Sequence, residues 1–450
     1  MTEFDVVVRG RVGGGGRVER VLCHPLLPLA VAWDVERPAV RVLDLSAGRL
    51  REVGCVGGES APYERELGWN RMRRTPAAAW HPELPSLVVA TEEGLVGWGA
   101  EGGVVPFPGA GGVAFPDSGG DRGTAFPEAG VNSAGAGAPG GVRYRDVAFS
   151  PGGRSLWASP SPEGGSDSWE RSDVIDPGSG RVLAGAGTRW DTGVAAHPGG
   201  GLVATLRSDQ GATHVIFGRV ADEAGPAPMR VLRRALILDA DGYGTPVFSA
   251  DGRHLAVRGN AYFNSVDVFA FPSLERVLSV PLGEPSPGFP YPDEWLAEMR
   301  SWSRQNIAFG PRPGELWIGT PKGTLVAVGV DGGEAVEHDV LTGAPVTALD
   351  ATATGDLLMA DGQGDLTLLA VRSGTAPPDR GEPAAAVAAF LASTSEVPED
   401  GADLQEHLVI TDGDRSWAAE DLATVDTAAE TDPSWLQIQA AVNRAGGEGV

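Results

Sequence analysis

The 60 acidic side chains and seven histidines of this chain could act as general acids, bases or metal ligands, but none falls into a familiar catalytic spacing. The sequence contains no nucleophile elbow, phosphate loop or zinc-binding helix motif. Residues 239–244 have the oxygen spacing that opens a calcium loop, but its twelfth position is Ala250 instead of an acidic residue. Residues 135–140 have dinucleotide-loop spacing without a preceding strand. We predict no enzyme, no metal site and no cofactor.

Three histidines, His24, His81 and His197, each precede a proline at equivalent points of a repeated pattern. Equivalent positions of a repeat lie far apart in space, so this repetition indicates a structural turn and not a shared metal. The other four, His214, His254, His338 and His407, have no obvious Ser or Asp partner in sequence. Cys23 and Cys55 fit neither a disulfide framework nor a metal spacing, and Cys23 is expected in the core.

Two segments carry side chains suited to protein binding. Residues 57–75 combine aromatic side chains with a basic cluster that is unusual in so acidic a chain. This segment is either a solvated loop or a docking patch for an acidic partner. Residues 281–305 contain a proline-rich run and then a helix expected over 294–304, with Asp293 as N-cap. Trp295, Met299 and Trp302 share one stripe of that helix, which either packs on its own domain or forms an exposed hot spot.

These segments interrupt a repeat that predicts the fold. Seven times the chain gives an apolar strand, a Pro or Gly turn, a second apolar strand, a polar tip and a third strand. The clearest copy has strands expected over 245–249, 254–258, 265–271 and 274–280, with an Asp-Gly turn after the first. Four antiparallel strands joined by hairpins form one propeller blade. With 65 Gly and 35 Pro in 450 residues, the chain favours short strands and tight turns. The sequence therefore predicts an all-β, seven-bladed β-propeller over residues 1–372.

The last copy lacks a fourth strand, whereas residues 4–8 form a strand that precedes the first blade. We expect this N-terminal strand to complete the seventh blade and close the ring. The excess length between copies lies mainly in residues 57–75, 108–141 and 281–305, each connecting one blade to the next. Insertions of this kind often mark a binding face.

Residues 40–50 resemble the third strand and following turn of a WD repeat, with Leu43 in place of the signature Trp. Residues 316–328 resemble a second such unit. The resemblance covers roughly residues 3–372 and implies a propeller whose inter-blade connections emerge on one decorated face. A related degenerate class, such as the quinoprotein-like propellers, remains an alternative.

Residues 373–450 form an acidic C-terminal extension of different composition. Helices are expected over 384–392, 417–428 and 434–443, the last with Asp432 as N-cap and Pro433 at its first position. Disorder is the alternative for residues 393–405. Trp417, Trp435 and Leu436 indicate that the rest docks, either on the side of the propeller or on a partner.

The formal net charge of −25 argues against nucleic-acid binding, because that affinity comes largely from Lys and Arg. The chain has neither an N-terminal signal pattern nor a run of about 18 apolar residues, so we expect a cytoplasmic protein without a membrane segment. Lys322 is the only lysine, and this preference for Arg indicates a GC-rich, bacterial genome.

The expected function is a non-catalytic scaffold that presents the loop-rich propeller face to an unidentified protein partner. The expected contact residues are Trp69, Arg71, Arg73, Arg74, Tyr291, Trp295 and Trp302. One alternative is a propeller enzyme, a hydrolase or lyase, with carboxylates and histidines converging at the central channel. The other is a regulatory or defence-associated sensor in which the extension transmits a signal. The fold cannot decide among these functions.

Overall fold

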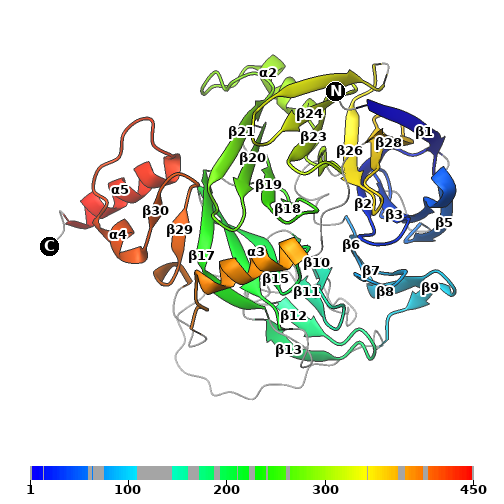
Figure 1. Cartoon of the computed structure of the whole chain (residues 1–450), viewed down its shortest axis with the longest axis horizontal. Coiled ribbons are helices and arrows are strands. Elements are labelled where there is room, and N and C mark those ends of the chain that lie inside the picture. Colours follow the sequence, from blue (N-terminus) through cyan, green and yellow to red (C-terminus); the bar gives the residue numbers. More distant parts are fainter. Residues whose placement is uncertain are drawn as a thin grey trace, which may run out of the picture.

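Seven β-sheets stand around a central axis and form a ring (Figure 1). The computed structural model describes residues 3–13, 15–58, 63, 75–108, 144–160, 172–186, 193–209, 211–221, 229–239, 242–259, 264–341, 343–372, 381–398 and 404–447. The predicted fold class, an all-β propeller of seven blades, is confirmed. Among the described residues the α-helices are few and short: α2 (Asp293–Ser301), α3 (Gly381–Ala392), α4 (Ala419–Thr424) and α5 (Ser434–Gly447).

Each blade is an antiparallel meander that runs from the axis outward. Blade 1 comprises β2 (Val18–Cys23), β3 (Leu29–Asp34), β4 (Val40–Asp44) and β5 (Arg51–Val56), with the short 3-10 turn η1 (Ser46–Gly48) before β5. Blade 2 comprises β6 (Ala77–Trp80), β7 (Ser86–Thr91), β8 (Gly94–Gly99) and β9 (Gly103–Pro106). Blade 3 comprises β10 (Tyr144–Phe149), β11 (Leu156–Pro160), β12 (Ser172–Ile175) and β13 (Val182–Ala186).

The remaining blades follow the same plan. Blade 4 contains β14 (Ala195–Ala196), β15 (Leu202–Asp209), β16 (Ala212–Arg219) and β17 (Arg230–Asp239). Blade 5 contains β18 (Val247–Phe248), β19 (His254–Arg258), β20 (Asn264–Ala270) and β21 (Arg276–Leu282). Blade 6 contains β22 (Ile307–Phe309), β23 (Glu315–Gly319), β24 (Thr324–Gly329) and β25 (Ala335–Asp339). Blade 7 contains β26 (Val346–Ala351), β27 (Leu357–Asp361), β28 (Asp365–Arg372) and β1 (Glu3–Arg11).

The ring closes between the first and last strands, as predicted. Strand β1 pairs antiparallel with β28 in a register that runs from Glu3↔Arg372 to Arg11↔Asp365. Arg9 adds ion pairs at 2.8 Å to both Asp361 and Asp365. The N-terminal strand therefore supplies the outermost strand of blade 7.

Apolar side chains from neighbouring blades share common clusters, which hold the blades together. Leu43 of blade 1 belongs to the same buried cluster as Leu358 and Leu366 of blade 7, and all three side chains are fully buried. Trp33, Trp157 and Trp317 occupy the second strands of blades 1, 3 and 6, each with at most 1% of its surface exposed. Burial of this kind, worth about 25 cal/mol per Å² of apolar area, is the main stabilising contribution.

The repeated His-Pro turns link one blade to the next, which confirms their structural role. His24 Nδ1 accepts the N–H groups of Leu26 and Leu27. Its Nε2 lies 2.9 Å from the carbonyl oxygen of Leu84 in blade 2. His197 repeats the arrangement, with Nδ1 accepting Gly199 N–H and Nε2 lying 2.9 Å from the Gly252 oxygen of blade 5. Because Nδ1 accepts, the proton sits on Nε2 and the ring must be neutral.

Replacing His197 with Gln is expected to lower the free energy of unfolding by about 1–2 kcal/mol near pH 7.5, and by less near pH 5.5. Burial holds the pKa of His197 below its ordinary value of 6.5 in the folded protein. The stabilisation is therefore complete above pH 6.5 and is lost as the pH falls, by up to about 1.4 kcal/mol per pH unit. Urea denaturation of both proteins across this range measures the difference. A difference that grows on acidification would contradict a neutral histidine.

The C-terminal extension docks on the propeller. Strand β29 (Val409–Thr411) pairs parallel with β17, and β30 (Ser416–Trp417) pairs with β29, so the sheet of blade 4 has six strands. Helix α3 lies across one face of the ring, where Val387 and Phe390 join the cluster between blades 4 and 5. Helices α4 and α5 lie outside the ring, beyond β29 and β30 (Figure 1). A short 3-10 turn, η5 (Leu404–Glu406), precedes β29.

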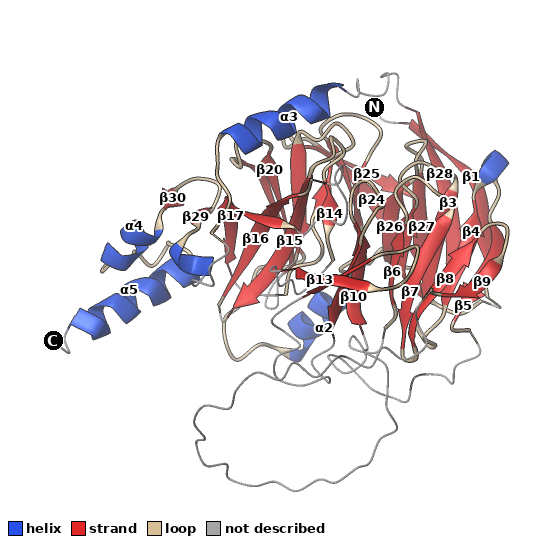
Figure 2. Cartoon of the chain, turned by 90° about the horizontal axis from the view of Figure 1, so that it is seen from below, coloured by secondary structure: helices blue, strands red, loops and turns tan. Residues whose placement is uncertain are grey.

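The two faces of the disc differ. The turns between the first and second strands of the blades lie on the face covered by α3, where Pro383 sits close to Gly199 and Gly252. Because alternate strands run in opposite directions, the connections between blades emerge on the other face. Figure 2 shows α2 on that side, opposite α3. We call this side the connection face and define it by residues 283–305, which lie between β21 and β22.

Candidate functional site: an aromatic platform on the connection face

Residues 283–305 form a compact platform between blades 5 and 6. Helix α2 begins at Asp293, preceded by Pro292, and ends at Ser301. The sequence predicted a later start and an end at residue 304, with Asp293 as N-cap. Instead, Asp293 and Glu294 lie in the first turn, where carboxylates interact favourably with the positive end of the helix dipole.

The aromatic stripe of this segment packs against the propeller. Trp295 is 8% exposed, and its Nε1 donates to the carbonyl oxygen of Glu284 at 3.1 Å. The Tyr291 ring stacks on Trp295, with centroids 5.0 Å apart and planes at 24°. Trp302 is partly buried against the cluster between blades 5 and 6. Gly283 has a φ of +82° and lies under Met299 and Trp302, so a larger residue there would strain the backbone and collide with them.

Arg258 anchors the helix from below. Its side chain is 1% exposed and donates to Asn306 Oδ1 at 2.8 Å and Asn264 Oδ1 at 3.1 Å. It also donates to the carbonyl oxygen of Ser303 at 2.8 Å, while Asn264 Nδ2 donates to that of Met299. Burial, together with repulsion from Arg304, lowers the pKa of Arg258 to about 9. The network ties the end of α2 to both neighbouring blades.

The structure therefore brings together three of the predicted contact residues, Tyr291, Trp295 and Trp302. The other four, Trp69, Arg71, Arg73 and Arg74, lie outside the described residues. The sequence prediction did not include Phe289, which is 88% exposed and meets the edge of Tyr291 at 6.0 Å between ring centroids. The run Pro287-Gly288-Phe289-Pro290 could have indicated it, because no helix or strand period there offers the ring a buried face.

The central channel carries charged side chains from three blades. Arg20 on β2, Asp146 on β10 and Asp350 on β26 all lie on innermost strands. Arg20 attracts both carboxylates electrostatically and stacks over Trp33, 4.8 Å from the ring centroid. Burial of the two carboxyl groups raises the pKa of Asp146 and of Asp350 to about 6.

The channel carboxylates hold the backbone of the innermost strands. Asp146 Oδ1 accepts the N–H of Val147, and Asp350 accepts those of Ala351 and Cys23 at 2.9 and 2.7 Å. The Cys23 thiol is free and buried, and burial and the adjacent Asp350 raise its pKa well above the ordinary value. These hydrogen bonds hold the innermost strands of blades 1, 3 and 7 in place around the axis.

Replacing Asp146 with Asn is expected to raise the free energy of unfolding by about 1–3 kcal/mol near pH 7.5. The pKa of Asp146 lies above its ordinary value of 3.8, so the folded protein binds more protons and loses stability as the pH rises from about 4 to 6. Asn keeps an acceptor for Val147 N–H without the charge. Denaturant titrations near pH 4 and pH 7.5 measure the gain, which should vanish at the lower pH. A less stable variant near pH 7.5 would show that attraction from Arg20 outweighs burial.

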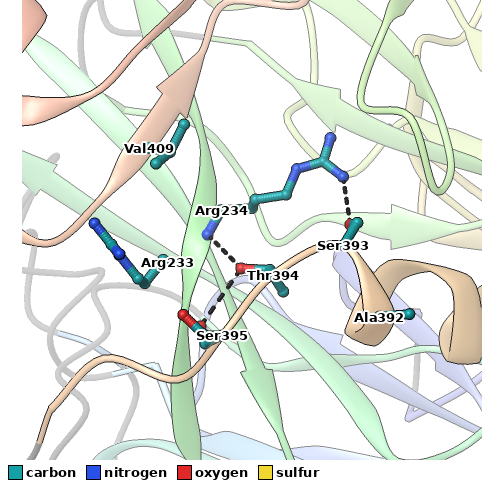
Figure 3. Close-up of a pocket in the computed structure, with 7 residues that line it drawn as sticks. All are labelled: Arg233, Arg234, Ala392, Ser393, Thr394, Ser395 and Val409. Carbon is teal, nitrogen blue, oxygen red and sulfur yellow. Dashed lines mark hydrogen bonds between the residues drawn. The ribbon is translucent and has the colours of Figure 1, made fainter.

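An open pocket of about 440 Å³ lies on the outer edge of blade 4, where the extension meets β17 (Figure 3). Its lining residues are Arg233, Arg234, Ala392, Ser393, Thr394, Ser395 and Val409. The two guanidinium groups point away from one another in Figure 3. Arg234 donates to Ser393 Oγ at 2.8 Å, and Arg233 Nε donates to the carbonyl oxygen of His407 at 2.8 Å. Their charges do not converge on one ligand position, so we assign this pocket to docking of the extension.

The described ranges lack two further features. No group of three or more His, Cys, Asp or Glu side chains there could hold a metal ion. In the same part of the chain, none of the helices has the length and apolar character needed to cross a membrane.

The ring of seven sheets, closed between β1 and β28, defines the chain as a seven-bladed β-propeller. No protein-family profile and no curated protein sequence matches the chain. Among solved structures, the chain is similar to hydrazine synthase from Kuenenia stuttgartiensis, with a TM-score of 0.51 and 13% sequence identity. The match covers 81% of this chain and 97% of that chain. At this identity the likeness is one of fold, which says nothing about chemistry.

Proposed function

We propose that this propeller is a non-catalytic scaffold that presents its connection face to a protein partner. The observation that supports the proposal is the platform of residues 283–305, in which a buried network centred on Arg258 holds the end of α2 and Tyr291 stacks on Trp295. Rigid aromatic side chains are frequent binding hot spots, because little conformational freedom is lost when they are covered. In this proposal Tyr291 and Trp302 contribute their accessible edges, and Trp295 supports them from beneath.

The proposal extends to the segment over residues 57–75. There Trp69 is a second aromatic anchor, and Arg71, Arg73 and Arg74 steer an acidic patch of the partner toward the face. We further propose that the protein belongs among the WD-repeat-like propellers and acts in the cytoplasm. The WD-like turn over residues 40–50 supports the first of these statements.

An enzyme with its site at the central channel is the second candidate, favoured by the convergence of Arg20, Asp146 and Asp350. Against it, both carboxylates already accept backbone N–H groups. The histidines with the clearest roles, His24 and His197, are held by hydrogen bonds in turns that link neighbouring blades. A general acid or base must lie within hydrogen-bond reach of the proton that it transfers, and these carboxylates are instead used to hold the backbone. These observations support the scaffold over the enzyme.

Affinity capture with the full chain tests the scaffold. The test variants are a triple change of Arg71, Arg73 and Arg74 to Glu, and a double change of Tyr291 and Trp302 to Ala. The matched control replaces the exposed Val104 and Val105 on β9 with Ser. At least one partner should be recovered in stoichiometric amount, retained by the control and lost by one or both test variants. If every specific partner stays bound to both test variants, the proposal is wrong.

A further inference from the structure

Phe289 lies at the tip of the platform with 88% of its surface exposed. By contrast, Phe217, Phe269 and Phe390 are each at most 1% exposed. The Phe289 ring has an edge contact with Tyr291, with centroids 6.0 Å apart at 89°. Water disfavours exposed aromatic surface, so a partner surface that covered this ring would gain free energy.

The residues that support Phe289 are held by contacts with the chain before it and with the helix after it. Tyr291 stacks on Trp295, and Trp295 donates to the carbonyl oxygen of Glu284. The N–H of Glu284 in turn donates to Glu298 Oε1 at 3.2 Å, which ties the chain before the tip to the helix after it. A partner that covers Phe289 therefore meets a ring on an ordered base and does not have to order a free loop.

The exposed charged side chains that flank this tip in the sequence are acidic. Glu284 precedes it, and Asp293 and Glu294 follow it at the start of α2; all three are exposed. The basic residues of the segment, Arg300 and Arg304, come only at and beyond the end of the helix. The whole chain carries a net charge of −25. A surface that covers Phe289 must therefore supply positive charge around its apolar centre.

We propose that Phe289 is the central anchor of the docking site and inserts into an apolar pocket rimmed by Lys or Arg on a protein partner. This inference rests on the scaffold function proposed above. It specifies the chemistry of the partner surface that covers Phe289 and the acidic side chains beside it. Glu284, Asp293 and Glu294 face the basic rim. Their role is in steering and orientation, while the ring supplies the buried contact.

Other occupants fit the charge pattern poorly. Anionic membrane leaflets and nucleic-acid backbones carry the same sign as this surface and are repelled by it. Two copies of the chain, each with a net charge of −25, repel one another at low ionic strength. A protein partner can carry an apolar pocket for the ring and Lys or Arg side chains around that pocket.

Photocrosslinking identifies the occupant directly. The photoreactive residue p-benzoylphenylalanine is introduced at position 289 of the full chain and, as a matched control, at Val336, which is 42% exposed on β25. Both proteins are irradiated in a lysate of the source cells, and the crosslinked peptides are sequenced. The purified partner is then titrated with the wild-type chain, Phe289→Ser and Val336→Ser over a range of salt concentrations.

The expected result is one protein crosslinked from position 289 and not from 336, through an apolar segment that contains Lys or Arg. Phe289→Ser should weaken its binding at least about tenfold, Val336→Ser less than about twofold, and added salt should weaken the wild-type complex. Crosslinks to a second copy, to lipid or to a segment without basic residues would overturn the inference, as would no crosslink above the control. If a stoichiometric partner still binds through Tyr291 or the arginines, only this inference fails. If no stoichiometric partner is captured, the proposed function fails as well.

Discussion

Deletion of residues 1–11 is expected to lower the free energy of unfolding by more than about 4 kcal/mol, or to leave the protein insoluble. The deletion removes β1 and therefore the outermost strand of blade 7. Strand β28 becomes an open edge, and the cluster that includes Leu369 and Val371 loses Phe4, which packs against it. Unpaired strand edges with apolar side chains favour aggregation. Calorimetry and sedimentation of the full and shortened chains measure the loss of stability and of monomer.

Arg372→Ala is the control for this deletion, because it removes only the exposed ion pair between Arg372 and Asp5 at the same seam. Exposed ion pairs contribute little, so the cost should be below about 1 kcal/mol. A shortened chain that remains monomeric and melts cooperatively within about 2 °C of the full chain would show that blade 7 does not need β1.

The blades could be predicted from the sequence because their signals are local. A Gly or Asp-Gly turn and two short apolar runs are visible within about 15 residues. The prediction for residues 254–258 coincides with β19 (His254–Arg258). The first and last strands of that blade were predicted over 245–249 and 274–280, whereas β18 spans Val247–Phe248 and β21 spans Arg276–Leu282. Strand ends depend on the partner strand, which the local pattern does not contain.

The C-terminal extension contains elements that the local sequence pattern could not predict. Strand β29 has three residues, too few for any period, and forms because the edge of β17 is available to pair with it. A helix was predicted over residues 417–428, but Trp417 pairs with Ile410 in the sheet, and α4 begins only at Ala419. Tertiary pairing therefore overrides the helical propensity of the first residues. Helix α5 begins at Ser434 as predicted, since its start depends on the proline before it.

In the candidate site, too, some residues could be predicted from the sequence and others could not. Trp295 and Met299 lie on α2, as the helical spacing predicted, whereas Trp302 lies one residue beyond its end. Packing on the propeller was one of the two outcomes considered. Arg258 could not be found, because its partners Asn264, Ser303 and Asn306 come from different parts of the chain. The channel group of Arg20, Asp146 and Asp350 spans blades 1, 3 and 7, and only ring closure places its charges together.

Phe390→Ala is expected to release the C-terminal extension from blades 4 and 5. Phe390 is fully buried, with its ring centroid 4.9 Å from Phe217 and 5.0 Å from Phe271. The Arg234 guanidinium lies over the Phe390 ring, 5.2 Å from its centroid, and donates hydrogen bonds to Ser393 Oγ and to the carbonyl oxygen of Ser273. Arg234 therefore joins α3 to both blades. Truncating a buried Phe costs about 3–5 kcal/mol. Because each 1.4 kcal/mol is tenfold, amide hydrogens of α3 should exchange roughly 100-fold faster or more.

The exposed Ala389, one residue earlier on the same helix, provides the control. Ala389→Ser changes the helix surface without touching the cluster, so the exchange of α3 should stay within about threefold of the wild type. The amides of β19 and β23, inside blades 5 and 6, should be unaffected in both variants if the extension docks as a separate unit. Faster exchange throughout the ring in Phe390→Ala would instead mean that α3 is part of the cooperative core, because Phe217 and Phe271 belong to the blades it joins.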